Sequence, residues 1–267
     1  MNMRAKETGF TLLEMITVIV ITGIIAAMVA VFLRTPVEQY MSITRRAEMS
    51  DIADVALRRI SRDIRLALPN SVRVTGTCDG TSACTLEYIP TTGGGRYLAD
   101  ESANALSFDA ADTSFNVLGP MPAMAVGNHI VIYNLGIPGA DAYLNQNRAA
   151  YAGNTATTVT IASTLFPFDS PGHRFHVVTP PVRYVCAPNA ANPALGTLTR
   201  ESGYGWPEAP VTPAAQAVLA TNVSRCRFTY DAFVVAQRSG LVSMELALTE
   251  GGETVSLYNA THVSNQP

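Results

Sequence analysis

The sequence predicts an α+β protein in which a long amino-terminal helix packs on a mainly antiparallel β-sheet domain. Three observations lead to this fold class. An apolar run near the amino terminus is long enough to cross a membrane, an amphipathic pattern of helical period follows it, and short β-type runs separated by glycine and proline follow Asn70. With 267 residues, the chain has room for a membrane anchor and one domain of about 200 residues with its own core.

The apolar run, residues 10–33, contains 24 residues and a single charged side chain, Glu14. A helix of that length reaches ~36 Å, which covers the ~30 Å hydrocarbon core of a bilayer. We therefore predict a transmembrane helix over residues 10–33.

Glu14 is the unusual residue of this span. A carboxylate inside an apolar run costs on the order of a few kcal/mol unless it has a partner, and such residues are typically functional. We expect no partner for it within the span. The alternative is an incidental polar residue that reaches the lipid headgroups from the start of the helix.

A short leader, residues 1–9, carries two cations and ends in Gly9, and Phe10 follows at once with the acid four residues further on. This segment resembles a type IV prepilin signal. The resemblance implies cleavage after Gly9 on the cytoplasmic side by prepilin peptidase and methylation of the new amino terminus, Phe10. The apolar run then stays in the mature protein.

An ordinary secretory signal is the alternative interpretation of the same segment. It would show a small-residue cleavage site after its apolar core, and Ala26, Ala27 and Ala30 offer such residues.

Residues 34–68 are predicted to continue as an amphipathic helix. Its apolar stripe recurs at spacings of four, three, four and four residues: Ala53, Leu57, Ile60, Ile64 and Leu68. Pro36 predicts a kink or a break near Thr35, and Pro69 with Asn70 predicts the end of the helix. Four arginines, Arg58, Arg59, Arg62 and Arg65, crowd its carboxyl end, where they form either a solvated helix end or a site for a partner.

Residues 69–267 are predicted to form one β-rich domain. The expected strands are residues 71–77, 85–89, 105–109, 129–133, 157–161, 174–178, 182–186, 196–200, 225–230, 241–249 and 254–263. The last two form the clearest hairpin, because alternating apolar residues meet a Glu-Gly-Gly-Glu turn. Residues 136–154 and 187–213 are predicted to be long loops, and residues 93–95, three glycines, a flexible turn.

The four cysteines form a close pair, Cys78 and Cys84, and a distant pair, Cys186 and Cys226. An even number in an exported domain favours disulfides over buried free thiols. Three connectivities are possible, and pairing of sequence neighbours is the simplest.

We find no catalytic set, no metal site and no cofactor motif. His173 and His176 would lie on opposite faces of a strand, and the acid pairs Asp109 with Asp112 and Asp100 with Glu101 do not match a calcium loop. The net charge is −3, and the chain after Leu68 contains nine arginines and fourteen acidic residues. This acidic balance does not indicate a surface for nucleic acid. The protein is therefore not expected to be an enzyme.

Taken whole, the chain resembles the type IV pilin-like proteins. The leader and the acid-bearing span carry this resemblance, and residues 51–65, 67–73 and 257–265 are similar to the large minor pilins of the PilW and secretion-system J type, including those of mannose-sensitive haemagglutinin (MSHA) pilus biogenesis. It implies assembly with other pilins and minor pilins through Glu14, and interaction with prepilin peptidase and an inner-membrane assembly platform. The location implied is the inner membrane, crossed once, with the amino terminus cytoplasmic, the β domain periplasmic, and the pilus tip as a further destination.

Three other functions fit the same sequence. One is a minor pseudopilin of a type II secretion system, another is a membrane-anchored periplasmic enzyme or binding domain, and the third is adhesion to a surface through the loops.

Overall fold

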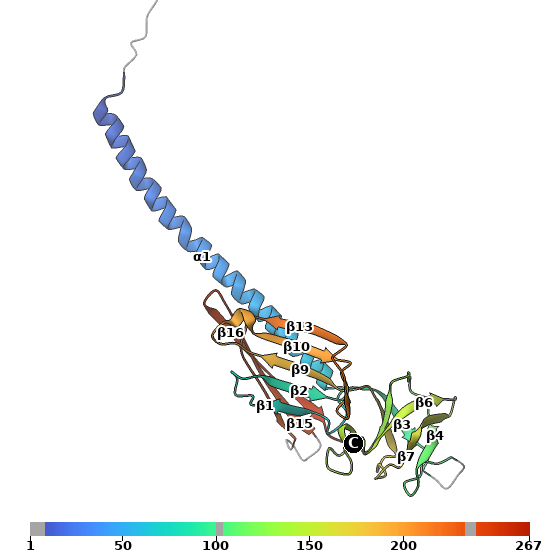
Figure 1. Ribbon diagram of the computed structural model, residues 1–267. Helices are drawn as coiled ribbons and strands as arrows, with labels where there is room; N and C mark the ends of the chain where they lie inside the picture. The colour runs from blue at the N-terminus through green and yellow to red at the C-terminus, as the bar shows by residue number, and fades with distance from the viewer. Residues whose placement is uncertain (1–8, 100–103, 233–238) are drawn as a thin grey trace, which may run out of the picture. The chain divides into compact units, whose positions relative to one another are not determined.

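The computed structural model describes residues 9–99, 104–232 and 239–267, and the chain divides into two compact units, Met1–Glu48 and Met49–Pro267. The α+β fold class is confirmed (Figure 1). Helix α1 (Leu12–Ile64) contributes residues to both units, and all strands belong to the second unit. The cationic leader residues Arg4 and Lys6, and the acid pair Asp100 and Glu101, lie outside the described residues.

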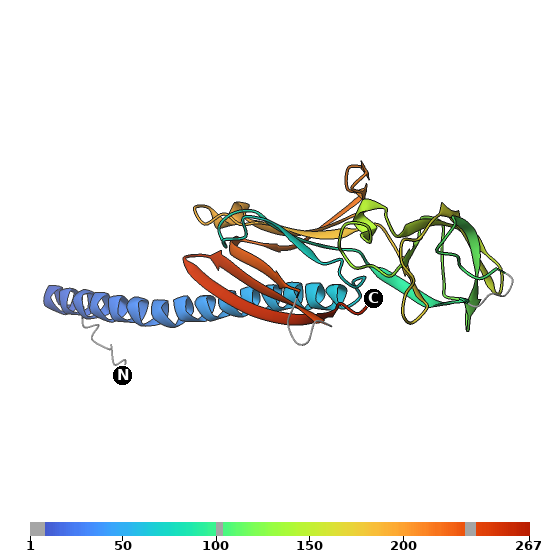
Figure 2. The same ribbon diagram turned by 90° about the horizontal axis from the view of Figure 1, so that it is seen from below.

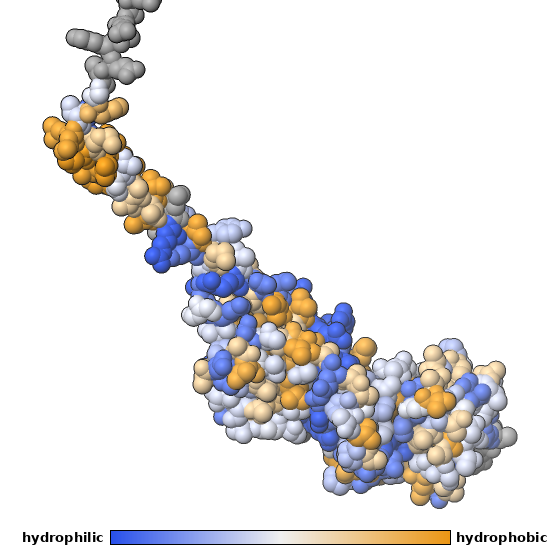
Figure 3. Space-filling model, turned by 45° about the horizontal axis from the view of Figure 1, so that its top comes forward, coloured by the Kyte–Doolittle hydropathy of each residue, from blue (hydrophilic) through white to orange (hydrophobic). Residues whose placement is uncertain are grey.

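Up to Phe32, α1 carries mainly apolar side chains in every direction. Every described side chain from Gly9 to Phe32 is exposed, including the bulky apolar ones, and Figure 3 shows this part of the helix as a largely hydrophobic surface. It contains a stretch that is long and apolar enough to cross a membrane. An apolar helix without a covered face is stable in lipid and not in water, so this surface is consistent with a single-pass membrane anchor.

Helix α1 continues without interruption through Pro36, so the predicted break near Thr35 is wrong. Proline removes one amide donor, but the other hydrogen bonds of a 53-residue helix remain in place. An ion pair between Arg34 and Glu38, with Nε and Oε1 2.7 Å apart, also spans the proline.

The carboxyl end of α1 lies at Ile64, four residues before the predicted end. The turn after the helix is tighter than an α-helical turn, because the Ala67 amide donates to the Ile64 carbonyl three residues earlier, at 3.1 Å. The next amide, that of Leu68, donates to the Ile89 carbonyl at 2.8 Å. Leu68 precedes Pro69 and is therefore disfavoured in a helical conformation. The chain leaves the helix to bond with the β region.

The part of α1 in the second unit is amphipathic as predicted. The stripe residues Ala53, Leu57, Ile60 and Ile64 are at most 2 % exposed and belong to the main core, whereas Leu68 is buried in a separate cluster beyond the helix. At ~25 cal/mol per Å² of buried apolar surface, each fully buried Leu or Ile side chain contributes ~1.5–3 kcal/mol.

Two antiparallel sheets complete the main core. The five-stranded sheet has the order β1-β2-β9-β10-β13 and the three-stranded sheet the order β14-β15-β16. The first comprises β1 (Arg73–Gly76), β2 (Cys84–Tyr88), β9 (Val182–Ala187), β10 (Thr197–Ser202) and β13 (Ala215–Thr221). The second comprises β14 (Val223–Asp231), β15 (Ser239–Glu250) and β16 (Glu253–Ser264), and its β15–β16 hairpin is the one predicted from the sequence.

A closed six-stranded barrel occupies the chain between β2 and β9. Its order is β3-β4-β7-β6-β5-β8, and Figure 2 shows its strands in a ring. The strands are β3 (Thr91–Tyr97), β4 (Asp112–Leu118), β5 (His129–Ile132), β6 (Arg148–Asn154), β7 (Thr158–Thr164) and β8 (Arg174–Val178). Because β2 pairs directly with β9, the barrel is an insertion between two neighbouring strands of one sheet.

The barrel has a core of its own. It is filled by apolar side chains such as Phe115 and Phe175, whose rings meet edge to face with centroids 5.4 Å apart. Closure leaves no unpaired strand edge and makes the insertion a self-contained unit of packing.

Several predictions for this region are wrong. The three glycines at 93–95 lie within β3, where close approach requires them: a Cβ on Gly94 would meet the Phe175 carbonyl at 2.8 Å, and one on Gly95 the Phe175 ring at 2.8 Å. Residues 105–109 are not a strand. The predicted loop 136–154 contains η1 (Ala142–Leu144) and β6, and the predicted loop 187–213 contains η2 (Pro193–Leu195), β11 (Gly205–Trp206) and β12 (Ala209–Pro210) in addition to the predicted strand 196–200, which is confirmed as β10.

Buried polar contacts join the barrel to the segment after α1 and to the β11–β12 hairpin. The Asn134 side chain donates to Pro69 O at 2.7 Å and accepts from the Ala142 amide at 2.9 Å. The Arg148 side chain, 2 % exposed, pairs with Glu208, and its guanidinium carbon lies 3.5 Å from the ring centre of Trp206. The Asn134 bonds satisfy buried polar groups, whereas Nε and Nη1 of Arg148 are buried and find no hydrogen-bond partner among the described residues, so the guanidinium relies on Glu208 and the Trp206 ring.

Both disulfides lie at the end of the β2–β9 ladder opposite to the one at which the insertion leaves the sheet, because the barrel is connected through Tyr88 and Val182. Cys78 is bonded to Cys84 and Cys186 to Cys226, which is the neighbour pairing favoured by the sequence. Cys84 and Cys186 are register partners on β2 and β9, so the two bridges are adjacent.

We predict unequal losses of stability when these bridges are removed. The separations are 6 and 40 residues, so chain entropy predicts a loss of ~2 kcal/mol for Cys78→Ser/Cys84→Ser and ~4 kcal/mol for Cys186→Ser/Cys226→Ser. Urea unfolding of the detergent-solubilised chain, followed by the fluorescence of its one tryptophan, measures both. Equal losses would contradict the entropic account.

His176 on β8 predicts a dependence of stability on pH. Burial, followed by the charge of Arg174, lowers its pKa to about 4 from 6.5. The fold therefore holds neutral histidine, so its contribution is complete above pH 6.5 and is lost as the pH falls towards 4.

The unfolding free energy should fall by about 2 kcal/mol more between pH 7 and pH 4 in the parent than in His176→Gln. His262→Gln is the control, because that side chain is exposed on β16. Parallel pH profiles for His176→Gln and the parent would refute this assignment.

Candidate functional site

The predicted cleavage site lies immediately before α1. Gly9 and Phe10 precede the helix, both are exposed, and a Cβ built on Gly9 would meet nothing within 4 Å. Phe10 itself is 78 % exposed. The peptide bond between these residues is therefore open to another molecule.

Glu14 caps the helix that follows. The Thr11 amide and hydroxyl both lie 3.4 Å from Glu14 Oε2 as donors, and the Glu14 amide donates to Thr11 Oγ1 at 3.3 Å. This reciprocal arrangement is a capping box, in which two amides at the start of a helix are satisfied by side chains three residues apart. The carboxylate also lies at the positive end of the helix dipole.

The expectation that Glu14 has no partner within its own span is therefore wrong. The partner is Thr11, and the Thr-x-x-Glu spacing that identifies it is a sequence signal for the start of a helix. Each hydrogen bond of this kind contributes about 1 kcal/mol, which offsets only part of the cost of placing a carboxylate in an apolar environment.

The cap uses one carboxylate oxygen. Both hydrogen bonds from Thr11 reach Oε2, and within residues 9–99, 104–232 and 239–267 no hydrogen bond to Oε1 is found. An ionised carboxylate accepts at both oxygens. Glu14 can therefore keep its helix cap and accept a cation from another molecule at the same time.

An exposed Gly9–Phe10 junction and an acid in the first turn of an apolar helix thus occur together. Residues 4–30 match the prokaryotic N-terminal methylation motif. This motif supports a type IV pilin-like or pseudopilin-like protein of structural character, which interacts with pilins and with prepilin peptidase. No curated protein and no solved structure matched the chain in the corresponding comparisons.

The four cysteines do not form a reactive or metal-binding site, because all are in disulfides. Across the described part of the chain, no group of three or more His, Cys, Asp and Glu residues is placed to hold a metal ion. The Asp112 carboxylate accepts the Ser107 amide at 2.6 Å, so it serves the turn before β4.

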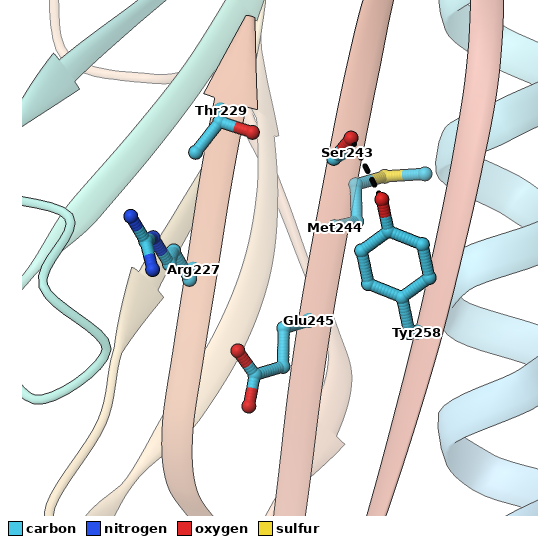
Figure 4. A pocket seen from close by; sticks show the side chains of 6 residues that line it. All are labelled: Arg227, Thr229, Ser243, Met244, Glu245 and Tyr258. Atoms are coloured by element: carbon cyan, nitrogen blue, oxygen red, sulfur yellow. Dashed lines mark hydrogen bonds between the residues drawn. The ribbon is translucent and has the colours of Figure 1, made fainter.

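The β14–β16 sheet has a shallow depression of about 230 Å³ on its exposed face (Figure 4). It is lined by Arg227, Thr229, Ser243, Met244, Glu245 and Tyr258. The Tyr258 hydroxyl donates to Ser243 Oγ at 3.0 Å. These six side chains provide no histidine to activate the serine, so the depression lacks a nucleophile paired with a base.

Proposed function

We propose that the chain is a minor pilin-like subunit that is cut after Gly9, methylated at Phe10, and joined to the priming or tip complex of a type IV pilus of the MSHA type. The observation that carries the proposal is the methylation motif at residues 4–30, which includes most of an apolar helical segment whose described side chains are exposed. The motif accounts for processing, and the helix accounts for retention in the membrane and for packing against other subunits.

Glu14 is proposed to set the position of each subunit. Once Phe10 is the amino terminus, the ammonium of one subunit can meet the free Oε1 of Glu14 in its neighbour. Two unit charges ~4 Å apart attract by about 4 kcal/mol at an effective dielectric constant of 20, and lost hydration offsets part of this gain. The ion pair therefore fixes the register, while the apolar helices supply most of the contact area.

The β region supports a role at low copy number. A separately closed barrel inserted between β2 and β9 enlarges the subunit far beyond the helix and the two sheets that form the main core. A large insertion of this kind is harder to repeat along a regular fibre than at one end of it. The proposed location is the inner membrane, with the amino terminus in the cytoplasm and the β region in the periplasm, where an oxidising environment matches the two disulfides.

A minor pseudopilin of a type II secretion system is the second candidate, since the same motif and helix serve a short secretion fibre equally well. Deletion of the gene, followed by assays of surface piliation and of enzyme secretion, separates the two roles.

Processing is tested by mass spectrometry of the mature amino terminus. We expect an amino-terminal peptide that begins with N-methyl-Phe10, and its loss in a strain without prepilin peptidase. An intact Met1, or cleavage after Ala26, Ala27 or Ala30, would remove the basis of the proposed function.

The role of Glu14 is tested by comparing Glu14→Gln with Thr11→Val. Both changes weaken the capping box, but only the first removes the negative charge. If Glu14 pairs with a neighbouring amino terminus, Glu14→Gln should lower incorporation into filaments at least tenfold, and Thr11→Val should lower it less than threefold. The measurement is the subunit content of sheared filaments relative to the processed membrane pool.

Equal effects of the two variants would show that Glu14 acts only as a helix cap. Undiminished incorporation of Glu14→Gln would likewise dismiss the ion pair.

A further inference from the structure

A groove of about 380 Å³ runs between the carboxyl-terminal turns of α1 and strand β16. Figure 4 shows turns of α1 beside the strand that carries Tyr258, which is β16. The groove is lined by Arg58, Ser61 and Arg62 of α1, by Arg65, which follows the last residue of the helix, and by Asn259, Ala260 and Thr261 of β16. All of these residues belong to the second unit.

Two of the three arginines have no acidic partner. Arg62 and Arg65 are exposed and take part in no ion pair within the residues that the structure describes. Arg58 forms an ion pair with Asp54, which lies one helical turn earlier, with Nε and Oδ2 2.8 Å apart. The groove therefore carries an excess of positive charge.

The arginines of the sheets differ in this respect. Arg73 pairs with Glu87, Arg183 with Glu201, and Arg200 with Asp63. These arginines of the sheets have acidic partners, whereas within the described residues Arg62 and Arg65 of the groove have none.

The two hydroxyl groups of the groove already have an acceptor inside it, so the donors that a ligand can use are mainly those of the arginines. The Ser61 hydroxyl donates to Asn259 Oδ1 at 3.0 Å, and the Thr261 hydroxyl donates to the same oxygen at 3.3 Å. Because Asn259 Oδ1 accepts both of these bonds, the Nδ2 group is the remaining donor of this side chain. The groove therefore selects a ligand that is rich in acceptors and negatively charged.

The dimensions fit several carboxylates better than one small anion. Arg58 and Arg62 lie ~6 Å apart along α1 and Arg65 follows the end of the helix, and 380 Å³ corresponds to about a dozen water molecules at ~30 Å³ each. One phosphate would engage a single arginine or two and leave most of the groove empty. Acidic side chains spaced along a polypeptide can reach arginines on successive turns, each through a planar two-point contact.

We propose that this groove is the docking site for an acidic segment of a partner protein. The inference does not require the proposed function, because it rests only on the charge, spacing and volume of residues in the second unit.

The test uses the full-length chain in a neutral detergent and a fluorescein-labelled octaglutamate peptide as the probe. Fluorescence anisotropy at low salt should show binding that Arg62→Glu/Arg65→Glu weakens at least tenfold. The matched control is Arg59→Glu, which reverses an exposed charge on the same helix outside the groove and should change the affinity less than threefold. Melting curves of each variant confirm that the fold is retained.

Competition identifies the class of ligand. Unlabelled octaglutamate should displace the probe, whereas octaglutamine and inorganic phosphate at the same concentration should not. Equal weakening by Arg59→Glu, displacement by phosphate at matched concentration, or preferential binding of the chain to phosphatidylglycerol vesicles through Arg62 and Arg65 would each overturn the proposal.

Discussion

The β region depends on the pairing of β2 with β9. These strands are neighbours in one sheet although the whole barrel lies between them in the chain. The pairing brings the two ends of the insertion together, and the adjacent disulfides hold β2 to the turn before it and β9 to β14. Because the bridges and the ladder restrain the same two strands, the barrel can close on its own core without disturbing the packing of α1.

The two parts of α1, before and after Phe32, are suited to different surroundings. The first is apolar on every side, and the second buries one stripe and exposes charges on its other faces. The burial of Ala53, Leu57, Ile60 and Ile64 fixes one face of the second part against the sheets. The remaining faces are left for solvent or for partners, and the arginine groove lies on one of them.

Glu14 illustrates how one side chain can serve both structure and assembly. Its capping box with Thr11 stabilises the start of the helix within one molecule, and its second carboxylate oxygen, Oε1, can accept a cation. In an apolar environment a carboxylate with only two weak hydrogen bonds is still under-compensated. The cap therefore explains why the residue is tolerated, and the proposed ion pair explains why an acid would be required.

Sequence reasoning succeeded where one periodic rule decides burial. It located the apolar span, the helical stripe and the β15–β16 hairpin, because helix and strand each impose a fixed spacing on buried residues. It did not find the barrel, since strands such as β3 and β6 are rich in glycine and alanine and show no clear alternation. Gly94 and Gly95 illustrate the reason, because what requires them is the position of Phe175, which is 80 residues away in the chain.

The sequence by itself determined the methylation motif, the helix long and apolar enough to cross a membrane and the pairing preference of the cysteines, because these follow from composition and short-range spacing. Only the tertiary structure decided that β2 and β9 are neighbours, that the chain between them closes into a barrel, and that three arginines share a groove with β16. Such contacts join residues far apart in the chain, and their selection depends on how the whole core can be filled.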